Sequence, residues 1–403
     1  MSESDFKYKN KRILQIIPNM EIGGAERTVL EITNFLKETN FLSMVLTSGG
    51  KLINDLEKAN IEVIKLPIDK KNPYSVIKNF FIFIKIFREK KIDLVHVRSR
   101  GPAWSAIFAA KRIGIPVLTT WHGHVSNSSF LKKIYNSIML KGDAVIANSS
   151  YTAKRISEIY NIDINKIDII SRGVDVKLYE LGKFSKTEID NIKKLWSIDN
   201  NKRIILFPAR LTRWKGHLVT IEAINFLKKE KFFNETIFIF AGEKSGAESY
   251  VKKLDSLIEK YKLQKNIKLV ERIENMQLAY QASEIVLSPS IEPEPFGRIP
   301  IETQAAGKTI IASDHGAVKD TIISGDSFTG FKVKPNDPLA LSEAIKKSIL
   351  MDGKDLNEMH DRAVLNVKNN FSLESMCKKT LEVYKRLLIS EWISWHDIFR
   401  RQS

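Results

Sequence analysis

The sequence has a single cysteine and no long apolar run. Because Cys377 has no second cysteine to pair with, an intrachain disulfide, a cysteine-ligated zinc site and a CxxC redox pair are excluded. The longest apolar candidate, residues 80–84, ends at Lys85, far short of the ~18–20 residues that a membrane-spanning helix needs. The N-terminal segment also lacks the apolar core and cleavage site of a signal peptide. A cytoplasmic location is the simplest interpretation.

The overall composition excludes several further classes of protein. The chain has 403 residues, of which 43% are hydrophobic and 28% are charged, the balance of a soluble globular protein. Disorder, collagen and a coiled-coil rod do not fit that balance. At ~100–200 residues per domain, we expect two or three domains.

Basic residues outnumber acidic ones. Lysine and arginine total 64 against 47 aspartate and glutamate residues, which gives a formal net charge of +17. Such an excess attracts polyanions: nucleic acid, an anionic membrane surface or phosphorylated substrates. The alternative is a drift in surface composition, because the chain is also rich in isoleucine and asparagine.

Short apolar runs alternate with amphipathic helical stretches, which is the pattern of α/β folds with parallel sheets. Helical patterns such as 25–37 and 76–89 fill the intervals between the runs, and the chain is helical from residue 372 onward. Strands are expected at residues 12–18, 41–47, 61–66, 92–97, 116–120 and 144–147, and again at 203–208, 236–241, 266–270, 284–287 and 309–312.

A polar, lysine-rich stretch at about residues 175–201 separates the two series and is interpreted as an interdomain connection. We therefore expect two tandem Rossmann-like, doubly wound domains that face each other across a cleft. The N-terminal domain takes residues 1–180 and the C-terminal domain residues 181–375. A helical tail, residues 376–403, is expected to return to the N-terminal domain.

A glycine pair follows the first expected strand. Gly23 and Gly24 stand at a strand-to-helix turn, where a phosphate or a sugar can approach the backbone and the amides of the helix N-terminus. The segment is not GxGxxG, and no acidic residue stands clearly at the position that a dinucleotide site requires, so hydride transfer is disfavoured. A plain tight turn is the alternative.

Two cations follow the strand expected at 203–208. Arg210 and Lys215 flank the carboxyl end of that strand, which is where α/β folds place their ligands. The planar fork of arginine and the point charge of lysine together suit a diphosphate. A basic surface loop is the alternative.

The most informative segment is 288–302, in which Glu294 lies in a loop and Glu302 about one turn inside the following helix. Carboxylates accept hydrogen bonds in pairs, which suits the diols of a sugar or a ribose. The amides of Phe296, Gly297 and Arg298 would form a helix N-terminus that attracts an anion. The alternative is a glutamate that serves the helix dipole beside a surface glutamate.

In their order and spacing, these motifs resemble the retaining glycosyltransferases of family 4, which have the GT-B fold. Residues 294–302 are similar to the Glu-x7-Glu motif of that family. Residues 209–216 are similar to its Gly-Arg-Leu-x-x-x-Lys-Gly segment, with Ala209 in place of glycine. Residues 23–26 are similar to its glycine-rich loop, and the resemblance extends over about residues 11–385.

The resemblance implies a nucleotide-diphosphate sugar, linked to UDP, GDP or ADP, as the donor. Arg210 and Lys215 would neutralise the departing diphosphate, Glu294 would hold the donor sugar, and Glu302 would hold the ribose. The other implied donor contacts are the loop with Gly23 and Gly24, the amides of Phe296, Gly297 and Arg298, and, near the base, Arg272 and Ile273.

His122 matches the histidine that this family places beside the donor sugar and the acceptor. It would be a catalytic positioning residue, with a purely structural histidine as the alternative. Members of the family usually work without a bound metal or cofactor. Retention would follow from a same-face displacement, and a covalent route through Glu294 stays open as the second possibility.

The acceptor is expected on the first domain. Arg98 and Arg100 would meet a phosphorylated or acidic acceptor and Trp104 would stack on a sugar, as in members that build lipopolysaccharide or other surface glycans. Helix 76–89 combines aromatics with lysines and would rest on an anionic membrane at the inner face of the plasma membrane. The alternative is a core-facing helix with a solvated basic face.

Three functions are therefore weighed. The first is a metal-independent, retaining glycosyltransferase that acts on a glycolipid or polysaccharide acceptor. The second is a nucleotide-sugar epimerase on the same fold, which epimerised donor without any acceptor would favour. The third, a nucleic-acid-binding protein, is prompted only by the charge, because the sequence shows no specific recognition motif.

Overall fold

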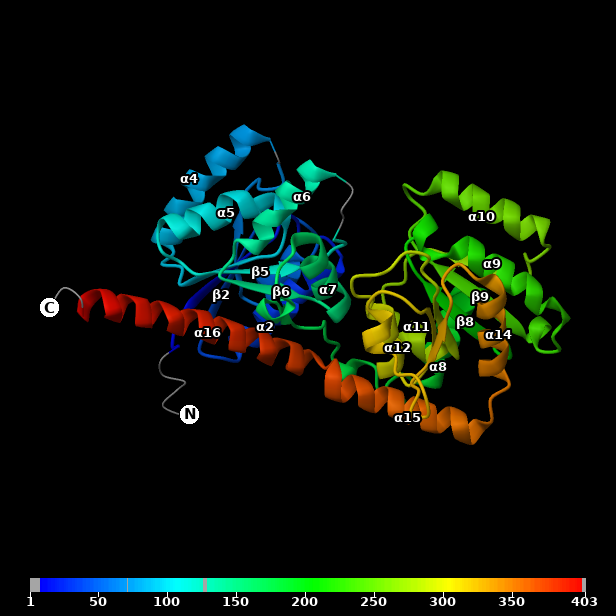
Figure 1. Ribbon diagram of the computed structural model, residues 1–403. Coiled ribbons are helices and arrows are strands. Elements are labelled where there is room, and N and C mark those ends of the chain that lie inside the picture. The colour runs from blue at the N-terminus through cyan, green and yellow to red at the C-terminus, as the bar shows by residue number, and fades with distance from the viewer. Residues whose placement is uncertain (1–7, 71, 126–128, 401–403) are drawn as a thin grey trace. The chain divides into compact units, whose positions relative to one another are not determined.

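The computed structural model describes residues 8–70, 72–125 and 129–400, with side chains as far as residue 389. The chain divides into two compact units (Figure 1). The first unit comprises Met1–Arg172 together with Leu373–Ser403, and the second comprises Gly173–Ser372. No helix within the described residues has the length and apolar content needed to cross a membrane.

The first unit is built on a parallel sheet in the order β3-β2-β1-β4-β5-β6-β7. Each strand expected in the first half of the chain is present, with ends that differ by at most two residues. The additional strand β7 has only two residues, too few for a periodicity to show in the sequence. The strands are β1 Arg12–Ile16, β2 Leu42–Thr47, β3 Glu62–Lys65, β4 Leu94–Val97, β5 Val117–Trp121, β6 Ala144–Ala147 and β7 Asp168–Ile169.

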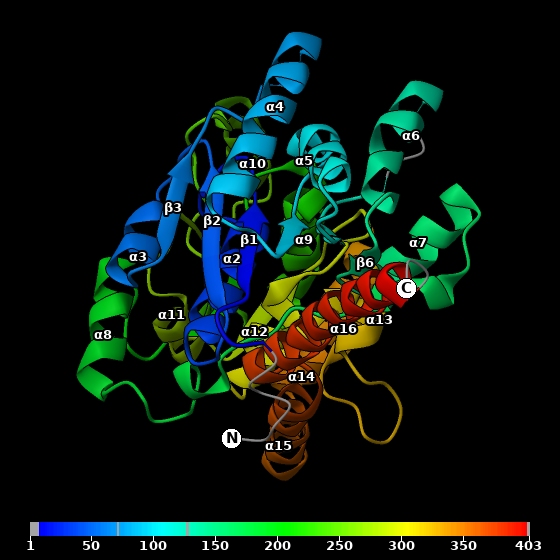
Figure 2. The same cartoon turned by 90° about the vertical axis from the view of Figure 1, so that its left-hand side faces the viewer.

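Helices cover both faces of this sheet (Figures 1 and 2). Successive residues of β1 enter different cores, because side chains alternate along a strand: Leu14 packs with α4 and α5, and Ile13 packs with α2 and α16. The helices are α2 Gly24–Lys37, α3 Ile53–Lys58, α4 Pro73–Glu89, α5 Arg100–Arg112, α6 Phe130–Ser137, α7 Ser150–Tyr160 and α16 Leu373–Arg400, with short 3-10 turns η1 Ile138–Leu140 and η2 Ile164–Lys166.

Helix α16 returns from the second unit to pack on α2 and β4 of the first. Its buried Tyr384 hydroxyl is hydrogen-bonded to His96 Nδ1 at 2.6 Å, and the other ring nitrogen of His96 is 2.7 Å from Thr120 Oγ1. Nearer the surface, Arg386 makes a two-pronged ion pair with Asp168 of β7. The C-terminal helix is thus part of the first unit, as the expected fold class requires.

The second unit contains a parallel sheet in the order β10-β9-β8-β11-β12-β13. Strand β9 is buried along its whole length, which explains its continuous apolar sequence. Two parallel α/β sheets confirm the fold class expected from the sequence. The strands are β8 Arg203–Pro208, β9 Thr236–Ala241, β10 Ile267–Val270, β11 Ile285–Ser288, β12 Thr309–Ser313 and β13 Phe331–Val333, of which β13 was not expected.

Two helical layers enclose this sheet as well. Helices α9, α10 and α14 share one core, and α11, α12 and α15 lie over the other. The helices are α8 Lys186–Leu195, α9 His217–Phe226, α10 Glu248–Lys260, α11 Met276–Ala282, α12 Arg298–Ala305, α13 Val318–Thr321, α14 Pro338–Ile349 and α15 Gly353–Asn370, with 3-10 turns η3 Val176–Leu178, η4 Arg213–Lys215, η5 Leu227–Lys229 and η6 Phe233–Glu235.

The interpretation of residues 175–201 as only a connection is wrong. This stretch contains α8, which begins with a capping box between Ser185 and Glu188 and packs on α11. The capping box satisfies the first amides of the helix, and Ile192 and Trp196 enter the core. The lysines of α8 are mostly on its solvent side, which weakened its apolar periodicity.

Replacing Tyr384 with phenylalanine should lower the free energy of unfolding by about 1–3 kcal/mol, because His96 loses a buried hydrogen-bond partner. The matched control is Tyr74→Phe, since Tyr74 is 75% exposed and its change should stay within about 0.5 kcal/mol. Urea unfolding of both variants measures the difference. Equal values for the two variants would contradict the structural role of Tyr384.

Candidate functional site

In the second unit, an ion pair joins the loops that follow β8 and β11. Lys215 Nζ donates to Glu294 Oε1 at 2.7 Å, and the two side chains are only 11% and 12% exposed. The loops meet because β8 and β11 are neighbouring parallel strands, whose carboxyl ends lie at one edge of the sheet. Two residues that the sequence predicted separately are therefore direct partners.

Further contacts hold the lysine side of this pair. The amide of Ile291 donates to the carbonyl of Trp214 at 2.8 Å, which ties the two loops together. The Lys215 ammonium lies 4.2 Å from the centre of the Trp214 ring, within the range of a cation–π contact. Gly216 follows with φ +88°, and a Cβ there would overlap the carbonyl of Pro289. The turn after Lys215 thus requires glycine.

Glu294 is fixed through both its side chain and its backbone. Ser290 Oγ donates to Glu294 Oε1, and the amide of Ala317 donates to the Glu294 carbonyl at 3.0 Å. Gly316 has φ +59°, and a Cβ at this position would lie 2.6 Å from the Glu294 carbonyl oxygen. A Cβ on Gly297 would lie 3.2 Å from the Glu294 carboxylate. The carboxylate therefore sits close against the backbone that opens α12.

The second glutamate is held inside α12. Arg298 Nε donates to Glu302 Oε1 at 3.0 Å, and the Tyr280 hydroxyl donates to Glu302 Oε2 at 2.9 Å. Burial and the neighbouring carboxylate raise the pKa of Tyr280 well above its usual value, so the phenol keeps its proton. Phe296, just before the helix, packs against Phe371. Gly297, the N-cap of α12, supplies no side-chain cap to the helix.

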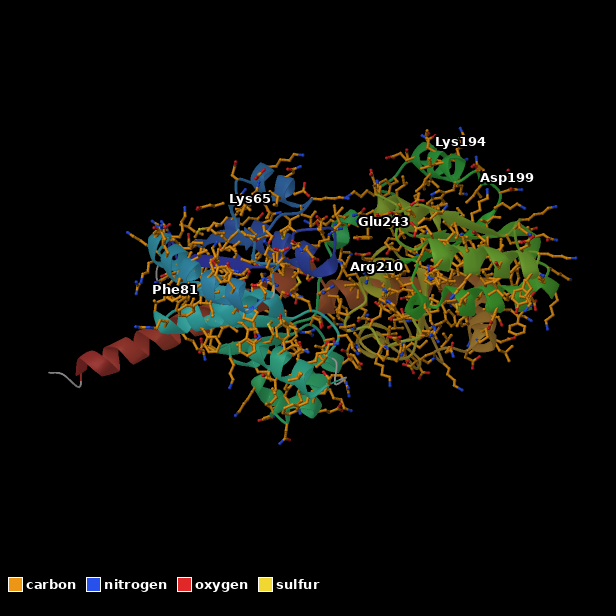
Figure 3. The ribbon with its side chains drawn as sticks, turned by 90° about the horizontal axis from the view of Figure 1, so that it is seen from above. Lys65, Phe81, Lys194, Asp199, Arg210 and Glu243 are labelled. Carbon is orange, nitrogen blue, oxygen red and sulfur yellow. The ribbon has the colours of Figure 1, made fainter. Side chains whose placement is uncertain are left out.

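Arg210 stands apart from these two buried ion pairs. It is exposed at the carboxyl end of β8, on the same edge of the unit as Glu243, which follows β9 (Figure 3). Gly242 brings the two loops together, since a Cβ there would overlap the carbonyl of Ala209. Arg210 is therefore an exposed cation at the rim of the site, whereas Lys215 is buried and held in place by its ion pair with Glu294.

Arg272 and Ile273 line a groove of about 920 Å³ after β10. Its other walls come from α8 and α11, with Trp196 and Leu278 among the apolar side chains. Arg272 is exposed and Ile273 is half-buried. A planar base can pack against the apolar wall of such a groove, and the guanidinium at its edge can contact the ring.

The first unit has a separate pocket of about 280 Å³ at the carboxyl ends of β1, β4 and β5. Arg98, Arg100 and His122 line it, and Glu26 is the acidic residue among the lining side chains. Three of the predicted residues of the first domain therefore share one pocket.

His122 is the least satisfied group of this pocket. Both of its ring nitrogens are buried and have no hydrogen-bond partner within the described part of the chain. Burial, together with the guanidinium groups of Arg172 and Arg98, lowers the pKa of His122 well below its usual value. The imidazole is neutral at pH 7 and can offer one donor and one acceptor to a ligand.

The two predicted arginines occupy different depths. Arg98 is only 4% exposed and donates to Gln15 Oε1 at 2.5 Å. Arg100 is half-buried, donates to the carbonyl of His124 at 2.8 Å and lies over the Trp121 ring. Burial lowers the pKa of both arginines from the usual value, yet a guanidinium remains charged in a protein. The pocket is therefore cationic.

Trp104, Gly23 and Gly24 are not among the residues that line this pocket. Trp104 Nε1 donates to the carbonyl of Tyr135, which attaches α5 to α6. Gly23 is the N-cap of α2 and supplies no side-chain cap. A Cβ on Gly24 would overlap the guanidinium of Arg172, so this glycine admits the arginine to the start of the helix.

Sequence reasoning missed several residues that hold the predicted ones. Ser290 stands four residues before Glu294, a spacing that carries no special signal, and Tyr280 reaches Glu302 from another helix. Arg172 and Gln15 approach the first-unit pocket from separate strands and loops. A metal-binding cluster of three or more histidine, cysteine or acidic side chains does not occur among the residues described.

Two family models match the chain. Residues 22–178 match the model described as Glycosyltransferase Family 4, and residues 188–365 match the model described as Glycosyl transferases group 1. The matches therefore extend over most of both units.

Two solved structures are similar over nearly the whole chain. A glycosyltransferase from Rickettsia africae ESF-5 is 35% identical, with 94% of this chain and 99% of that chain covered at a TM-score of 0.87. HepE from Anabaena, solved with UDP and glucose, is 20% identical, with coverages of 94% and 100% and a TM-score of 0.80. At this low sequence identity, the similarity to HepE is a similarity of fold alone.

Two curated proteins are similar over a smaller share. The D-inositol 3-phosphate glycosyltransferase of Xylanimonas cellulosilytica is 24% identical over 277 residues, which cover 65% of this chain and 64% of that protein. The chain thus spans less than two thirds of the length of this relative. The capsular polysaccharide biosynthesis glycosyltransferase CapH of Staphylococcus aureus is 28% identical over 294 residues, with coverages of 69% and 75%.

Acidification should destabilise the protein because of His217, the first residue of α9, which follows the loop that carries Lys215. His217 is fully buried on the Phe207 ring, and burial is the main cause that lowers its pKa to about 3. The unfolded chain takes up this proton near pH 6.5, so stability is complete above that pH and falls below it. Between pH 7.5 and 5.5 the loss is about 1.4 kcal/mol.

Urea unfolding of the parent and of His217→Phe at both pH values measures this contribution. The variant should lose about 1.4 kcal/mol less than the parent on acidification, whatever its stability at pH 7.5. An unchanged pH dependence in the variant would refute the assignment.

Proposed function

This chain belongs to the family 4, or group 1, glycosyltransferases with the GT-B fold, and we propose that it transfers a sugar, with retention, from a nucleotide-diphosphate sugar to a lipid-linked or surface-polysaccharide acceptor. The observation that carries this proposal is the Lys215–Glu294 pair beside the N-terminus of α12. A cation, a carboxylate and the N-terminus of a helix converge there, which are the groups that a sugar diphosphate needs.

The donor is bound in the second unit. Lys215 and Arg210 meet the diphosphate, and the amides of Phe296, Gly297 and Arg298 add positive potential at the start of α12. Glu294 accepts hydrogen bonds from the hydroxyls of the sugar and Glu302 from those of the ribose. The base lies against Arg272 and Ile273 in the apolar groove. UDP is the first candidate, because HepE was solved with UDP.

Transfer follows a same-face displacement. The bond between the anomeric carbon and the diphosphate oxygen breaks, and its electron pair leaves with the diphosphate. Lys215 and Arg210 stabilise that growing negative charge, so no metal ion is required for this role. The acceptor oxygen bonds to the same face of the anomeric carbon, and its proton passes to the departing phosphate oxygen. His122 positions the reacting groups.

The acceptor is proposed to be anionic. Arg98, Arg100 and the neutral His122 surround one pocket, whereas the loop with Gly23 and Gly24 at the start of α2 is assigned to the donor. A phosphate or carboxylate on the acceptor would satisfy these donors. One of the curated relatives is named for D-inositol 3-phosphate and another for capsular polysaccharide biosynthesis.

Trp104 is proposed to contact the more distant sugars of a long acceptor, because it lies one turn along α5 from Arg100 and is half-buried. An acceptor of this kind is presented at the inner face of the plasma membrane, where we place the protein.

Release of nucleotide from a panel of UDP-, GDP- and ADP-sugars, measured with EDTA present, tests the site. Lys215→Ala and Glu294→Ala should each reduce release from the active donor by about 100-fold or more. The matched controls Lys253→Ala and Glu259→Ala, on the exposed side of α10, should retain the parent rate. Equal activity in site and control variants would refute the proposed site.

Analysis of the sugar product separates transfer from epimerisation. Transfer gives a new glycosidic bond and nucleoside diphosphate in equal amounts, whereas an epimerase returns an altered nucleotide sugar. If neither a donor nor a nucleoside diphosphate raises the melting temperature of the protein, the proposed function is wrong.

A further inference from the structure

Helix α4 presents a row of large apolar side chains to solvent. Tyr74, Ile77 and Phe81 are 75%, 60% and 65% exposed, and their spacing of three and four residues places them on one face of the helix. On the opposite face, Phe83 and Phe87 are buried in the core of the first unit. The side chains of the exposed row are therefore not needed to pack α4 on the core of the first unit.

Helix α6 shows the same feature more strongly. Phe130 and Leu131 are 75% and 78% exposed and Ile134 is 45% exposed, while the one buried residue of the helix is Asn136. Phe108 of α5, 49% exposed, adds to the set. We call these side chains the apolar patch: Tyr74, Ile77, Phe81, Phe108, Phe130, Leu131 and Ile134.

Helix α5 connects the two rows. Ser105 Oγ of α5 donates to the carbonyl of Val76 in α4 at 2.7 Å, and Trp104 Nε1 donates to the carbonyl of Tyr135 in α6 at 3.2 Å. Figure 2 shows α4 and α6 on either side of α5, with both helices extending towards the same end of the first unit, and Figure 3 shows Phe81 on α4. The patch therefore belongs to one surface of the first unit.

The charge of these three helices indicates what covers the patch. Glu89, already 3.8 Å from Lys85, is the acidic residue of the three helices. Against it stand eight basic residues: Lys78, Lys85, Arg88, Arg100, Lys111, Arg112, Lys132 and Lys133. A second copy of the chain would bring like charges together. Nucleic acid offers no apolar phase for exposed phenylalanine and leucine side chains.

We propose that the apolar patch docks the first unit on an anionic lipid bilayer. The apolar side chains enter the boundary between headgroups and acyl chains, and the surrounding lysines and arginines meet the anionic headgroups. The helices lie on the membrane and do not cross it. Docking needs neither donor nor acceptor, so it goes beyond the proposed transfer and is tested without it.

Flotation of the full chain with vesicles tests the proposal. We expect binding to phosphatidylcholine vesicles that contain about 30% phosphatidylglycerol, weak binding to pure phosphatidylcholine, and a loss of binding as salt screens the charges. The variant Ile77→Ser/Phe81→Ser/Leu131→Ser should bind at least about tenfold more weakly.

The matched control replaces three equally exposed leucines of the second unit with serine: Leu339, Leu350 and Leu365, which are 56%, 63% and 56% exposed. This control should bind vesicles like the parent. Equal melting temperatures of the parent and both triple variants exclude unfolding as the cause of lost binding. Nucleotide release from the donor should persist in both variants.

The other outcomes contradict either the docking proposal or the proposed transfer. Equal vesicle binding by the patch variant and the parent would remove the role of the patch, and equal binding to neutral and anionic vesicles would remove the role of charge. A dimer in light scattering that the patch variant abolishes, without vesicle binding, would identify a second copy as the occupant. Vesicle binding without any donor turnover would refute the proposed transfer and leave the docking surface intact.

Discussion

Parallel strand pairing is the constraint on which the rest of this structure depends. In both sheets the paired strands run in one direction, so the loops that follow them emerge at a single edge. Lys215 and Glu294 are 79 residues apart in the chain, yet they touch, because β8 and β11 are neighbours. The pocket of the first unit arises in the same way from the ends of β1, β4 and β5.

The two units differ in how the positive charges of their sites are neutralised. In the second unit, the two buried site cations each have a carboxylate partner: Lys215 pairs with Glu294 and Arg298 with Glu302. These pairs hold the groups in place before any ligand arrives. In the first unit, arginines surround a neutral histidine. That pocket gains most from an anionic ligand, and this asymmetry underlies the proposed division between donor and acceptor.

Helix α16 connects the end of the chain to that pocket. Tyr384 contacts both His96 and Arg98, and Arg98 is hydrogen-bonded in turn to Gln15 of β1. The arginine is thus positioned by residues from two distant parts of the sequence, β1 and α16. On the opposite face of the sheet, α4 buries Phe83 and Phe87, α5 buries small and aliphatic side chains, and both helices leave other apolar side chains exposed. One face of the unit orients the pocket and the other offers a surface for docking.

The sequence by itself determined the class of fold and pointed to the residues that form the ion pairs of the second unit. Apolar runs of four to six residues are strong signals, and Glu294, Glu302 and Lys215 lie in local motifs whose spacing is visible in the chain. Strands β7 and β13 were missed because two or three residues carry no periodicity. Helix α8 was missed because its lysine-rich solvent side hides its apolar face.

Only the tertiary structure decided which groups are partners. The sequence places Arg98 after a strand, but its burial against Gln15 and Tyr384 depends on where α16 packs. The hydrogen bond from Tyr280 to Glu302 depends in the same way on the packing of α11 against α12. Local patterns reflect backbone preference and burial over a few residues. Side-chain partners and their protonation are set by neighbours from distant segments, which a linear pattern does not contain.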